Sequence, residues 1–356
     1  MKFFYPVLVF VLVALSAEAQ KKSLYGTPTL YNSIENPADP FFLGEREFLG
    51  LNLPIPSLRI DASIRGHGRN VILDAVFGDQ LIDLSVLRVG GNRVNRINTQ
   101  VELNSFMMKL RLNKKTKGEI SISSTTKFQA NIEIRDEFID VFLGGNFPYI
   151  GSQIDGFFDL QTEVFSYHEV KAGYRMEVND KLSIGASLGF LKGIQYQQVD
   201  VSDSYIYFAP RDSGYFIESY AKGTARSAGV DTEELGDIGQ QLFNSATDFK
   251  DLLGSNSFNL GVNYQLNDAL LLSFNLTDVG AVNWRQDGRI YRLDKKIKYE
   301  GVDITQEAEV RDSIFQSFGA FAIDSFDKVF KTPLNQRFKA GGAYTFNSRF
   351  VSRLFL

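Results

Sequence analysis

The stretch Leu182-Ser183-Ile184-Gly185-Ala186-Ser187-Leu188-Gly189-Phe190 alternates an apolar residue with a small or polar one at every step. It follows the polar turn Asn179-Asp180-Lys181, and Val164–Val178 before the turn alternates in the same way. An alternation of period two places all the apolar side chains of a β-strand on one face. The two runs therefore predict an antiparallel hairpin with one apolar and one polar face.

The same layout recurs along the chain, giving four such pairs of runs in all. Short polar turns join the two runs of each pair, whereas long connections separate the pairs, at about 129–162, 192–256 and 280–335. The runs match the ~9–11 residues that a tilted strand needs to cross a bilayer, and they exceed the ~5–6 residues usual in soluble sheets. Short turns at one end and long loops at the other are typical of outer-membrane barrels.

We therefore predict an all-β fold, an antiparallel transmembrane β-barrel of eight or more strands, over a secreted β-sandwich as the alternative. The barrel is expected over residues 58–356, after an N-terminal segment of residues 20–57. Apolar residues at helical spacing in Asp231–Leu253 and Gln306–Lys331 predict one or two short helices in the long loops.

The N-terminus has the features of an export signal. A basic start, the apolar stretch Phe3–Leu15 and the small residues of Ser16–Ala19 are typical of a secretory signal peptide. We expect residues 1–19 to be cleaved off before Gln20, and the mature chain to reach the outer membrane of a Gram-negative bacterium. A membrane anchor is the weaker alternative, because the apolar run is shorter than the ~20 residues that span a bilayer.

Composition narrows the chemistry open to the chain. Its 356 residues include no cysteine and two histidines, and the formal net charge is −4. Disulfides and thiolate metal sites are thereby excluded, and a nucleic-acid partner is not expected without a basic patch. We expect no cofactor and no metal, outer-membrane lipid as the main partner, and the long loops as the place for protein partners.

One serine and one histidine are candidates for catalysis. Ser187 lies in a G-x-S-x-G pattern, Gly185–Gly189, but the pattern falls inside a strand and not at the strand-to-helix turn that a nucleophile elbow needs. His168 is expected on the apolar face near a strand end. We predict no enzyme, with a membrane-embedded, lipid-directed enzyme as the remote alternative. The acidic groups within 133–140 and 231–237 lack the spacing of a calcium loop and are interpreted as solvated charge.

Charged residues also fall on the polar strand faces, among them Glu169, Lys171 and Arg175. An unpaired charge buried in the lumen would be costly, so we expect these side chains to pair and to fill the interior. Trp284 is the only tryptophan, and it is expected to anchor the barrel at the membrane interface.

The runs Asn275–Trp284 and Tyr299–Val302 contain the most specific motif of the chain, with Asp278, Gly280, Trp284 and Gly301 at its marked positions. This motif resembles the D-x-G-x-x-x-W … F-x-G pattern of a Bacteroidota family of outer-membrane barrels of unknown function. Weaker matches to that family occur at four other places: Leu143–Gly151, Ile184–Gly193, Thr332–Tyr344 and Asn36-Pro37-Ala38. The tripeptide is also found in barrels similar to long-chain fatty-acid transporters.

The resemblance covers about residues 25–346 and implies an outer-membrane barrel without implying what it does. In the transporter-like barrels the segment with this tripeptide plugs the lumen, so the resemblance implies that Asn36, Pro37 and Ala38 form a candidate lumen plug. Such barrels commonly end in an aromatic residue, whereas this chain ends at Phe355-Leu356. We therefore expect a C-terminally truncated, open barrel, with a last strand over Arg349–Leu356 that closes the barrel as the alternative.

Two functions are compatible with these features. The first is transport, or a channel, for small or hydrophobic molecules across the outer membrane. The alternative is a non-transporting scaffold or docking barrel in a secretion or gliding assembly. An open path through the lumen would favour the first, and large ordered loops would favour the second.

Overall fold

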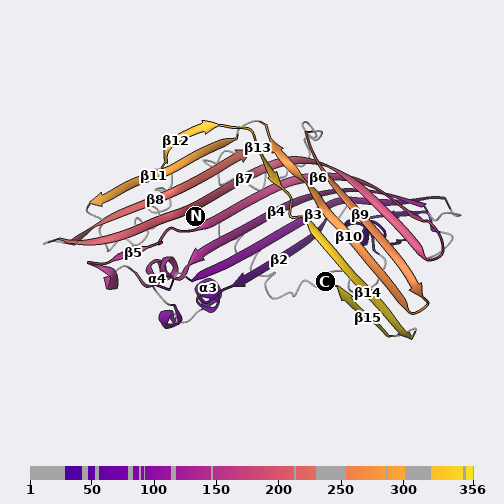
Figure 1. The fold of residues 1–356 in the computed structure, drawn as a ribbon, viewed down its shortest axis with the longest axis horizontal. Coiled ribbons are helices and arrows are strands. Elements are labelled where there is room, and N and C mark those ends of the chain that lie inside the picture. The colour runs from indigo at the N-terminus through magenta and orange to yellow at the C-terminus, as the bar shows by residue number, and fades with distance from the viewer. Residues whose placement is uncertain are drawn as a thin grey trace.

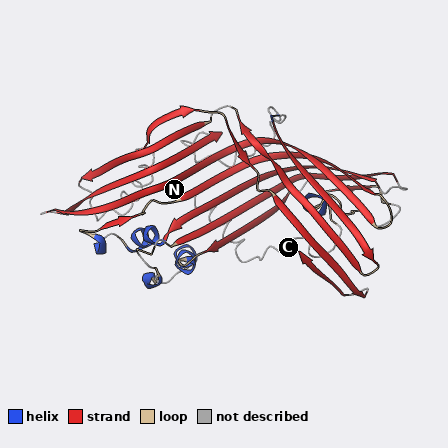
Figure 2. Cartoon of the chain, viewed as in Figure 1, coloured by secondary structure: helices blue, strands red, loops and turns tan. Residues whose placement is uncertain are grey.

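The computed structural model describes residues 29–41, 47–52, 56–78, 83–87, 90–91, 93–113, 118–145, 147–211, 214–229, 254–285, 288–300, 322–347 and 350–355. Within these ranges the strands form one antiparallel, 15-stranded sheet, accompanied by short helices (Figures 1 and 2). The predicted all-β fold is therefore confirmed. None of the described helices is long and apolar enough to cross a membrane.

The main path of the sheet follows the chain from β1 to β15. Its strands, in spatial order, are β1 (Leu49–Leu51), β3 (Val94–Asn113), β4 (Gly118–Arg135), β6 (Gln161–Glu177), β7 (Leu182–Arg211), β9 (Ser255–Asn267), β10 (Leu270–Trp284), β14 (Arg337–Asn347) and β15 (Phe350–Phe355). The two ends of this path do not pair with each other in the described part of the chain. The sheet is thus not closed, as in an open barrel.

The remaining strands attach to the sides of this path. They are β2 (Ser57–Arg65) on β3, β5 (Gln153–Asp155) on β7, β8 (Gly214–Gly229) between β7 and β11 (Arg289–Glu300), β12 (Ala322–Asp327) on β11, and β13 (Phe330–Pro333) on β10. The helices α3 (Arg69–Phe77) and α4 (Asp136–Gly144) lie beside the ends of β2, β3 and β4 (Figure 2). Their apolar residues Val71, Ile72 and Ile139 pack against Ile64, Ile97 and Ile134 of these strands.

β7 divides the molecule into two parts. Its first residues, Leu182–Leu191, pair with β9, whereas Gln195–Arg211 pair with β8. With 30 residues at ~3.3 Å per residue, β7 is ~100 Å long. The second part of β7 forms, with β5, β8, β11 and β12, an arm that we call the extension. Figure 1 shows its outer strands at the upper left and β9, β10, β14 and β15 at the right.

The extension occupies much of what was predicted to be long loops. The segment 192–256 contains the rest of β7 and β8, the segment 280–335 contains β11, β12 and β13, and the segment 129–162 contains the end of β4, α4 and β5. Bulges explain the error. The pairing of β7 with β6 shifts in register opposite Ser166 and Tyr167 of β6, and the pairing of β7 with β8 shifts between Val201 and Asp203. Each shift breaks the alternation that identifies a strand.

The predicted helices are not found where the chain is described. Asp231–Leu253 lies outside the described residues, and so does 306–321 of the second predicted helix. In the rest of that segment, 322–327 and 330–331 are strand, in β12 and β13, so the prediction is wrong there. In these two strands the chain pairs with β11 and β10, and backbone pairing overrides the weak helical spacing of the apolar residues.

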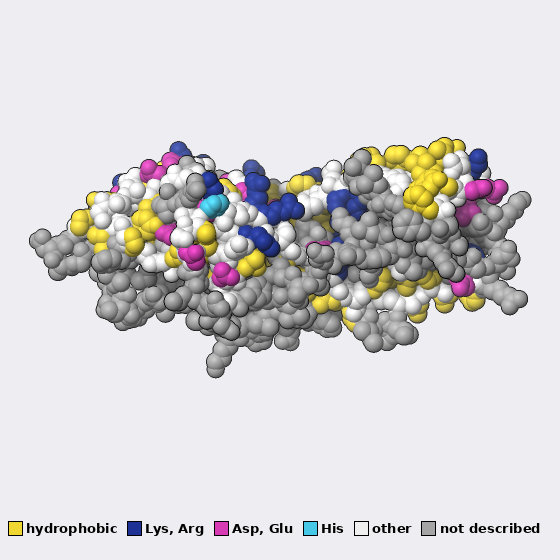
Figure 3. Space-filling view, turned by 90° about the horizontal axis from the view of Figure 1, so that it is seen from below, with side chains coloured by type: hydrophobic (Ala, Val, Ile, Leu, Met, Phe, Trp, Pro, Cys, Tyr) yellow, Lys and Arg dark blue, Asp and Glu magenta, His cyan; other side chains and the backbone are white. Residues whose placement is uncertain are grey.

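The two faces of the sheet have an unusual distribution of side chains. Leu188 of β7 is 45% exposed, whereas the neighbouring Ser187 is 5% exposed. The same holds across β6, β7, β9, β10 and β14, where the exposed side chains include Tyr174, Ile184, Phe258, Leu260, Tyr264, Phe274 and Tyr344. Figure 3 shows hydrophobic side chains gathered toward the right-hand end of the molecule, the end with the short turns. This part of the sheet is apolar outside and polar inside.

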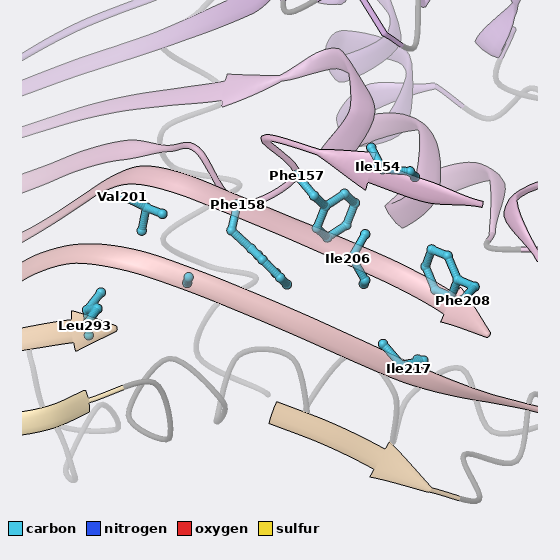
Figure 4. Close-up of a cluster of buried hydrophobic side chains, with 9 residues drawn as sticks. Ile154, Phe157, Phe158, Val201, Ile206, Phe208, Ile217 and Leu293 are labelled. Carbon is cyan, nitrogen blue, oxygen red and sulfur yellow. The ribbon is translucent and has the colours of Figure 1, made fainter. Parts of the chain in front are cut away.

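The extension is stabilised by a hydrophobic core of its own. Phe157 and Phe158, which follow β5, pack with Ile206 and Phe208 of β7 and with Ile217 of β8 (Figure 4). Phe208 is 1% exposed and Phe158 is 3% exposed. The extension is therefore a packed structure and not a pair of loose loops.

Replacing Phe208 by Ala should loosen the extension without unfolding the rest of the sheet. Removing a buried Phe side chain costs about 3–5 kcal/mol. We expect faster amide hydrogen exchange in β7, β8 and β11 of the extension, with exchange in β9 and β10 unchanged. Phe326→Ala is the matched control, because Phe326 is 42% exposed and its loss should have little effect. Unchanged exchange in Phe208→Ala would show that the core does not hold the extension together.

Candidate functional site

Lys127 of β4 is the centre of a buried charge cluster on the polar face. Its ammonium lies 3.2 Å from Glu169 Oε2 and 3.1 Å from Asp278 Oδ1, and its side chain is 2% exposed. Lys171 reaches the same two residues at 3.2 and 3.9 Å, and Arg337 Nη2 donates to Asp278 Oδ2 at 2.6 Å. The pairing predicted for Glu169 and Lys171 is confirmed, and the cluster ties β4 and β6 to β10 and β14.

A β-bulge in β10 positions Asp278. The register between β10 and β9 shifts between Leu276 and Val279, and Asp278 has a φ of 58°. Its backbone N–H donates to Asn259 Oδ1 at 2.7 Å. A Cβ at Gly280 would collide with the carbonyl oxygen of Asn256 across the ladder. The Asp and Gly of the motif are therefore explained by backbone geometry, because aspartate tolerates a positive φ and glycine allows close pairing after the bulge.

Trp284 is buried, so its predicted place at the membrane interface is wrong. It is 5% exposed, its Nε1 donates to Thr332 Oγ1 at 2.9 Å, and its ring lies 6.2 Å from that of Phe165. The bulge at Asp278 shifts the alternation by one residue, which turns Trp284 away from the apolar face. A Cβ at Gly193 would lie 2.5 Å from the indole ring, so this glycine makes room for it.

The tripeptide Asn36-Pro37-Ala38 lies against the polar face. Asn36 Oδ1 accepts from the backbone N–H of Ala38 at 3.0 Å, which closes a local turn around Pro37. Asn36 Nδ2 donates to Asn263 Oδ1 and to Ser273 Oγ, each at 3.0 Å. Arg175 Nε donates to the carbonyl of Ala38 at 2.8 Å. The tripeptide thus contacts β6, β9 and β10 at once.

Two glycines allow the tripeptide to pack closely against the sheet. Gly185 of β7 and Gly261 of β9 are direct cross-strand partners. A Cβ on Gly185 would collide with the Pro37 carbonyl, and a Cβ on Gly261 would collide with Asn36 Oδ1. Gly185 therefore serves close approach of another backbone, which is a structural reason for the first glycine of the G-x-S-x-G pattern.

A second charge cluster holds the residues around this tripeptide. Arg175 lies 3.5 Å from Glu119 and 3.2 Å from Glu177, and Lys109 lies 3.7 Å from Glu119. Lys109 Nζ also donates to the Asp39 carbonyl at 3.4 Å. We call Thr29–Phe41 the inner segment; it includes the short helix α2 (Asn32–Glu35).

Little space is left between the inner segment and the sheet. A cavity of about 10 Å³ lies among Leu30, Ile34, Lys109 and Lys171, and one of about 20 Å³ lies between Glu35 and Asp278. Cavities of this size hold on the order of one water molecule each. At these places the polar face is filled by paired charges and by the inner segment.

His168 and Ser187 are not brought together. Ser187 lies on the polar face beside Lys171. His168 lies on the apolar face, 2% exposed, with its Nδ1 2.9 Å from Thr126 Oγ1 and its Nε2 3.2 Å from Ser124 Oγ. The sheet separates the imidazole from the Ser187 hydroxyl, so the two side chains do not form the nucleophile and base pair of a hydrolase.

Two of the acidic residues of 133–140, Asp136 and Glu137, are buried and hydrogen-bonded within the protein. Asp136 and Glu137 begin α4 and are 0% and 1% exposed, so the interpretation as solvated charge is wrong for them. Asp136 accepts from Asn95 Nδ2 at 2.7 Å, and Glu137 accepts from the Gly90 N–H at 2.8 Å. No group of three or more acidic or histidine side chains in the described ranges could hold a metal. Residues 231–237 and Gly301 lie outside these ranges.

Replacing Lys127 by Met should strongly destabilise the protein, because Glu169 and Asp278 would lose a buried counter-charge. Breaking one partner of a buried ion pair costs about 3–5 kcal/mol. The measurement is the urea midpoint of unfolding in detergent. Lys296→Met is the control, because Lys296 pairs with Glu218 while its side chain is 53% exposed. Equal midpoints for the two variants would contradict a structural role for the cluster.

Replacing Gly185 by Ala should displace the inner segment while the strands stay paired. We expect limited proteolysis to cleave within Thr29–Phe41 in the variant but not in the wild-type protein. Gly342→Ala is the control, because a Cβ there would meet its nearest neighbour at 3.4 Å, an ordinary contact. If the segment stays protected in Gly185→Ala, it is not seated as described.

A comparison with known families adds one finding to this geometry. The model of a family described as "Family of unknown function (DUF5723)" matches residues 49–356. No curated protein and no solved structure matches the chain. The matched range includes the bulge at Asp278 and Gly280, the buried Trp284 and the charge cluster around Lys127. Because the match covers most of the chain, the protein belongs to this family of unknown function, DUF5723.

Proposed function

We propose that the protein is an outer-membrane β-barrel that does not conduct in its resting state and that uses its extension to dock a protein partner. The single observation that carries this proposal is the combination of a filled polar face with an extension that has its own core. On this sheet the apolar side chains are exposed and the polar ones are buried, which is the reverse of a soluble protein and supports the membrane location. The function is therefore that of a scaffold, with transport as the second candidate.

The apolar face has the height that a membrane requires. The outward side chains from Val170 on β6 to Val178, the residue directly after β6, precede the turn at the end of the hairpin. Beyond Val170 the row continues with His168. Thr126 and Lys192 lie beside His168 in register. The apolar stretch is thus about nine residues long, close to the ~9–11 residues of a membrane-crossing strand. A row of polar side chains then marks its upper border.

The filled interior argues against an open pore. The ammonium of Lys127 and the carboxylates of Glu169 and Asp278 occupy the polar face between β4 and β10. The inner segment covers the region between β3 and β10, with Ala38 fully buried. Moving a solute along this face would require breaking buried ion pairs, each costing several kcal/mol.

The extension supports docking. Its strands continue far beyond the apolar stretch of the outer face, which we call the apolar band. The core of the extension keeps these strands in fixed positions. Rigid elements hold a binding surface in place better than loose loops do. Exposed apolar side chains on its outermost strand and the following turn, Ile323, Phe326 and Val329, are the kind of residue that a partner would cover.

Transport remains the second candidate because of how the inner segment is held. Among the described residues, Thr29–Phe41 has no strand pairing and is attached by side-chain hydrogen bonds and ion pairs. A signal that released these contacts would open the space beneath the segment. Small or hydrophobic molecules would then be the cargo.

Conductance in planar lipid bilayers decides between the two candidates. For a docking barrel we expect the wild-type protein and Gly185→Ala to be equally silent, because the charge clusters still fill the polar face. For a gated transporter the wild type should be silent and Gly185→Ala should conduct. Wild-type protein that conducts steadily would contradict the closed resting state itself.

Photo-crosslinking in cells tests the docking surface directly. A photoreactive residue at Ile323 of β12 should yield one discrete crosslinked product, whereas the same residue at Leu188 on the apolar band should yield products with lipid only. Absence of any protein product from Ile323 would contradict docking by the extension.

A further inference from the structure

Two rungs of polar side chains cross β2, β3 and β4 on the polar face, above the Lys127 cluster. Residues in register on the three strands form each rung: Ser63, Asn98 and Asn131 in the upper one, and Asp61, Gln100 and Gln129 in the lower one. Five of these six side chains are uncharged. The rungs form a carboxamide-rich surface within the sheet.

Charged rungs border this surface on both sides. Above it lie Arg65, Arg96 and Glu133, with Arg96 Nε 2.6 Å from Glu133 Oε1. Below it lie Arg59 and Glu102, with Arg59 Nη1 3.8 Å from Glu102 Oε2. One ion pair thus lies on each border, and Asp61 is the one charged residue in the two rungs between them.

A cavity of about 180 Å³ lies over the two rungs. Its lining is polar throughout except for Ala62, and it contains no lysine, arginine or aromatic side chain. Asn335, between β13 and β14, closes one side, and its Nδ2 donates to Gln129 Oε1 at 2.9 Å. A volume of this size would hold on the order of ten water molecules, which is enough for a sugar ring.

The lining offers hydrogen-bonding groups of both kinds. In the described part of the chain no side-chain hydrogen bond engages the carboxamide of Asn98 or that of Asn131. Each carboxamide presents two N–H donors and an acceptor oxygen. Asp61 is held by Arg59 Nε at 2.9 Å, which fixes its carboxylate at the edge of the groove and gives it a paired cation.

We infer that this groove binds a neutral saccharide. Sugar hydroxyls donate and accept at the same time, and so they match carboxamides in fixed positions. An anion would need an unpaired cation in the lining, and a cation would need an unpaired carboxylate; the groove has neither. A peptide strand would instead pair with a free strand edge, whereas these side chains project from the face of the sheet. The site goes beyond the proposed docking function and depends on neither candidate.

The test is ligand-observed NMR on the full-length protein in detergent. The probes are glucose, N-acetylglucosamine and maltose as neutral sugars, glucuronate as a charged sugar, and tetra-alanine as a peptide. We expect saturation transfer to at least one neutral sugar, at a Kd at or below about 10 mM, and weaker or no transfer to glucuronate and tetra-alanine.

The double variant Asn98→Leu/Asn131→Leu should lower the affinity for that sugar by roughly tenfold or more, because it removes two sets of hydrogen bonds. Asn256→Leu is the matched control, since Asn256 is an exposed asparagine outside the groove, and it should bind like the wild type. Hydrogen exchange in β2, β3 and β4 shows whether the double variant keeps its fold.

Three results would overturn the inference. The first is no transfer to any neutral sugar at about 10 mM. The second is a sugar signal that the folded double variant retains in full, which would place binding elsewhere. The third is stronger binding of tetra-alanine or glucuronate than of every neutral sugar, which would assign the groove to a peptide or to an anion.

Discussion

A buried ammonium needs carboxylates beside it, and the position of Lys127 makes this requirement a constraint on the whole sheet. β4, which carries Lys127, and β10, which carries Asp278, are separated by β6, β7 and β9. In a flat sheet, four strand spacings of ~4.8 Å would put these strands ~19 Å apart. The ammonium and carboxylate nevertheless lie 3.1 Å apart, so the sheet must curl around the pair. The inner segment then fits into the concave side that this curvature creates.

The bulge at Asp278 connects this constraint to the motif of the chain. Below the bulge, Ser273 and Asn275 line the polar face; above it, the reversed alternation turns Trp284 inward to Phe165 and Thr332. One irregular residue thus supplies the acceptor for Lys127 and starts a hydrophobic cluster above it. Polar groups below and aromatic rings above close the interior between β6 and β10.

Regular alternation made the hairpins β6–β7 and β9–β10 predictable from the sequence, because successive residues there face the apolar and the polar side of the sheet in strict turn. The extension was missed because bulges reset the alternation and because both of its faces are partly buried, so no strict pattern remains. Lys127 was also missed, although it is a single lysine among uncharged inward residues from Ser121 to Asn131. Its partner Asp278 lies 151 residues away, and no local pattern reports a contact at that distance. The burial of Trp284 depends on a bulge that a motif alone does not reveal.

We propose that the apolar face meets lipid while the polar face is filled by paired charges and the inner segment. The chain has no cysteine, so single cysteines with spin labels can scan β7 from Ser183 to Phe190 in lipid bilayers. We expect a period of two, with high collision rates for oxygen at Ile184, Leu188 and Phe190, and low rates for both oxygen and a water-soluble nickel complex at Ser183 and Ser187. High access of the nickel complex at Ile184 and Leu188 would contradict it.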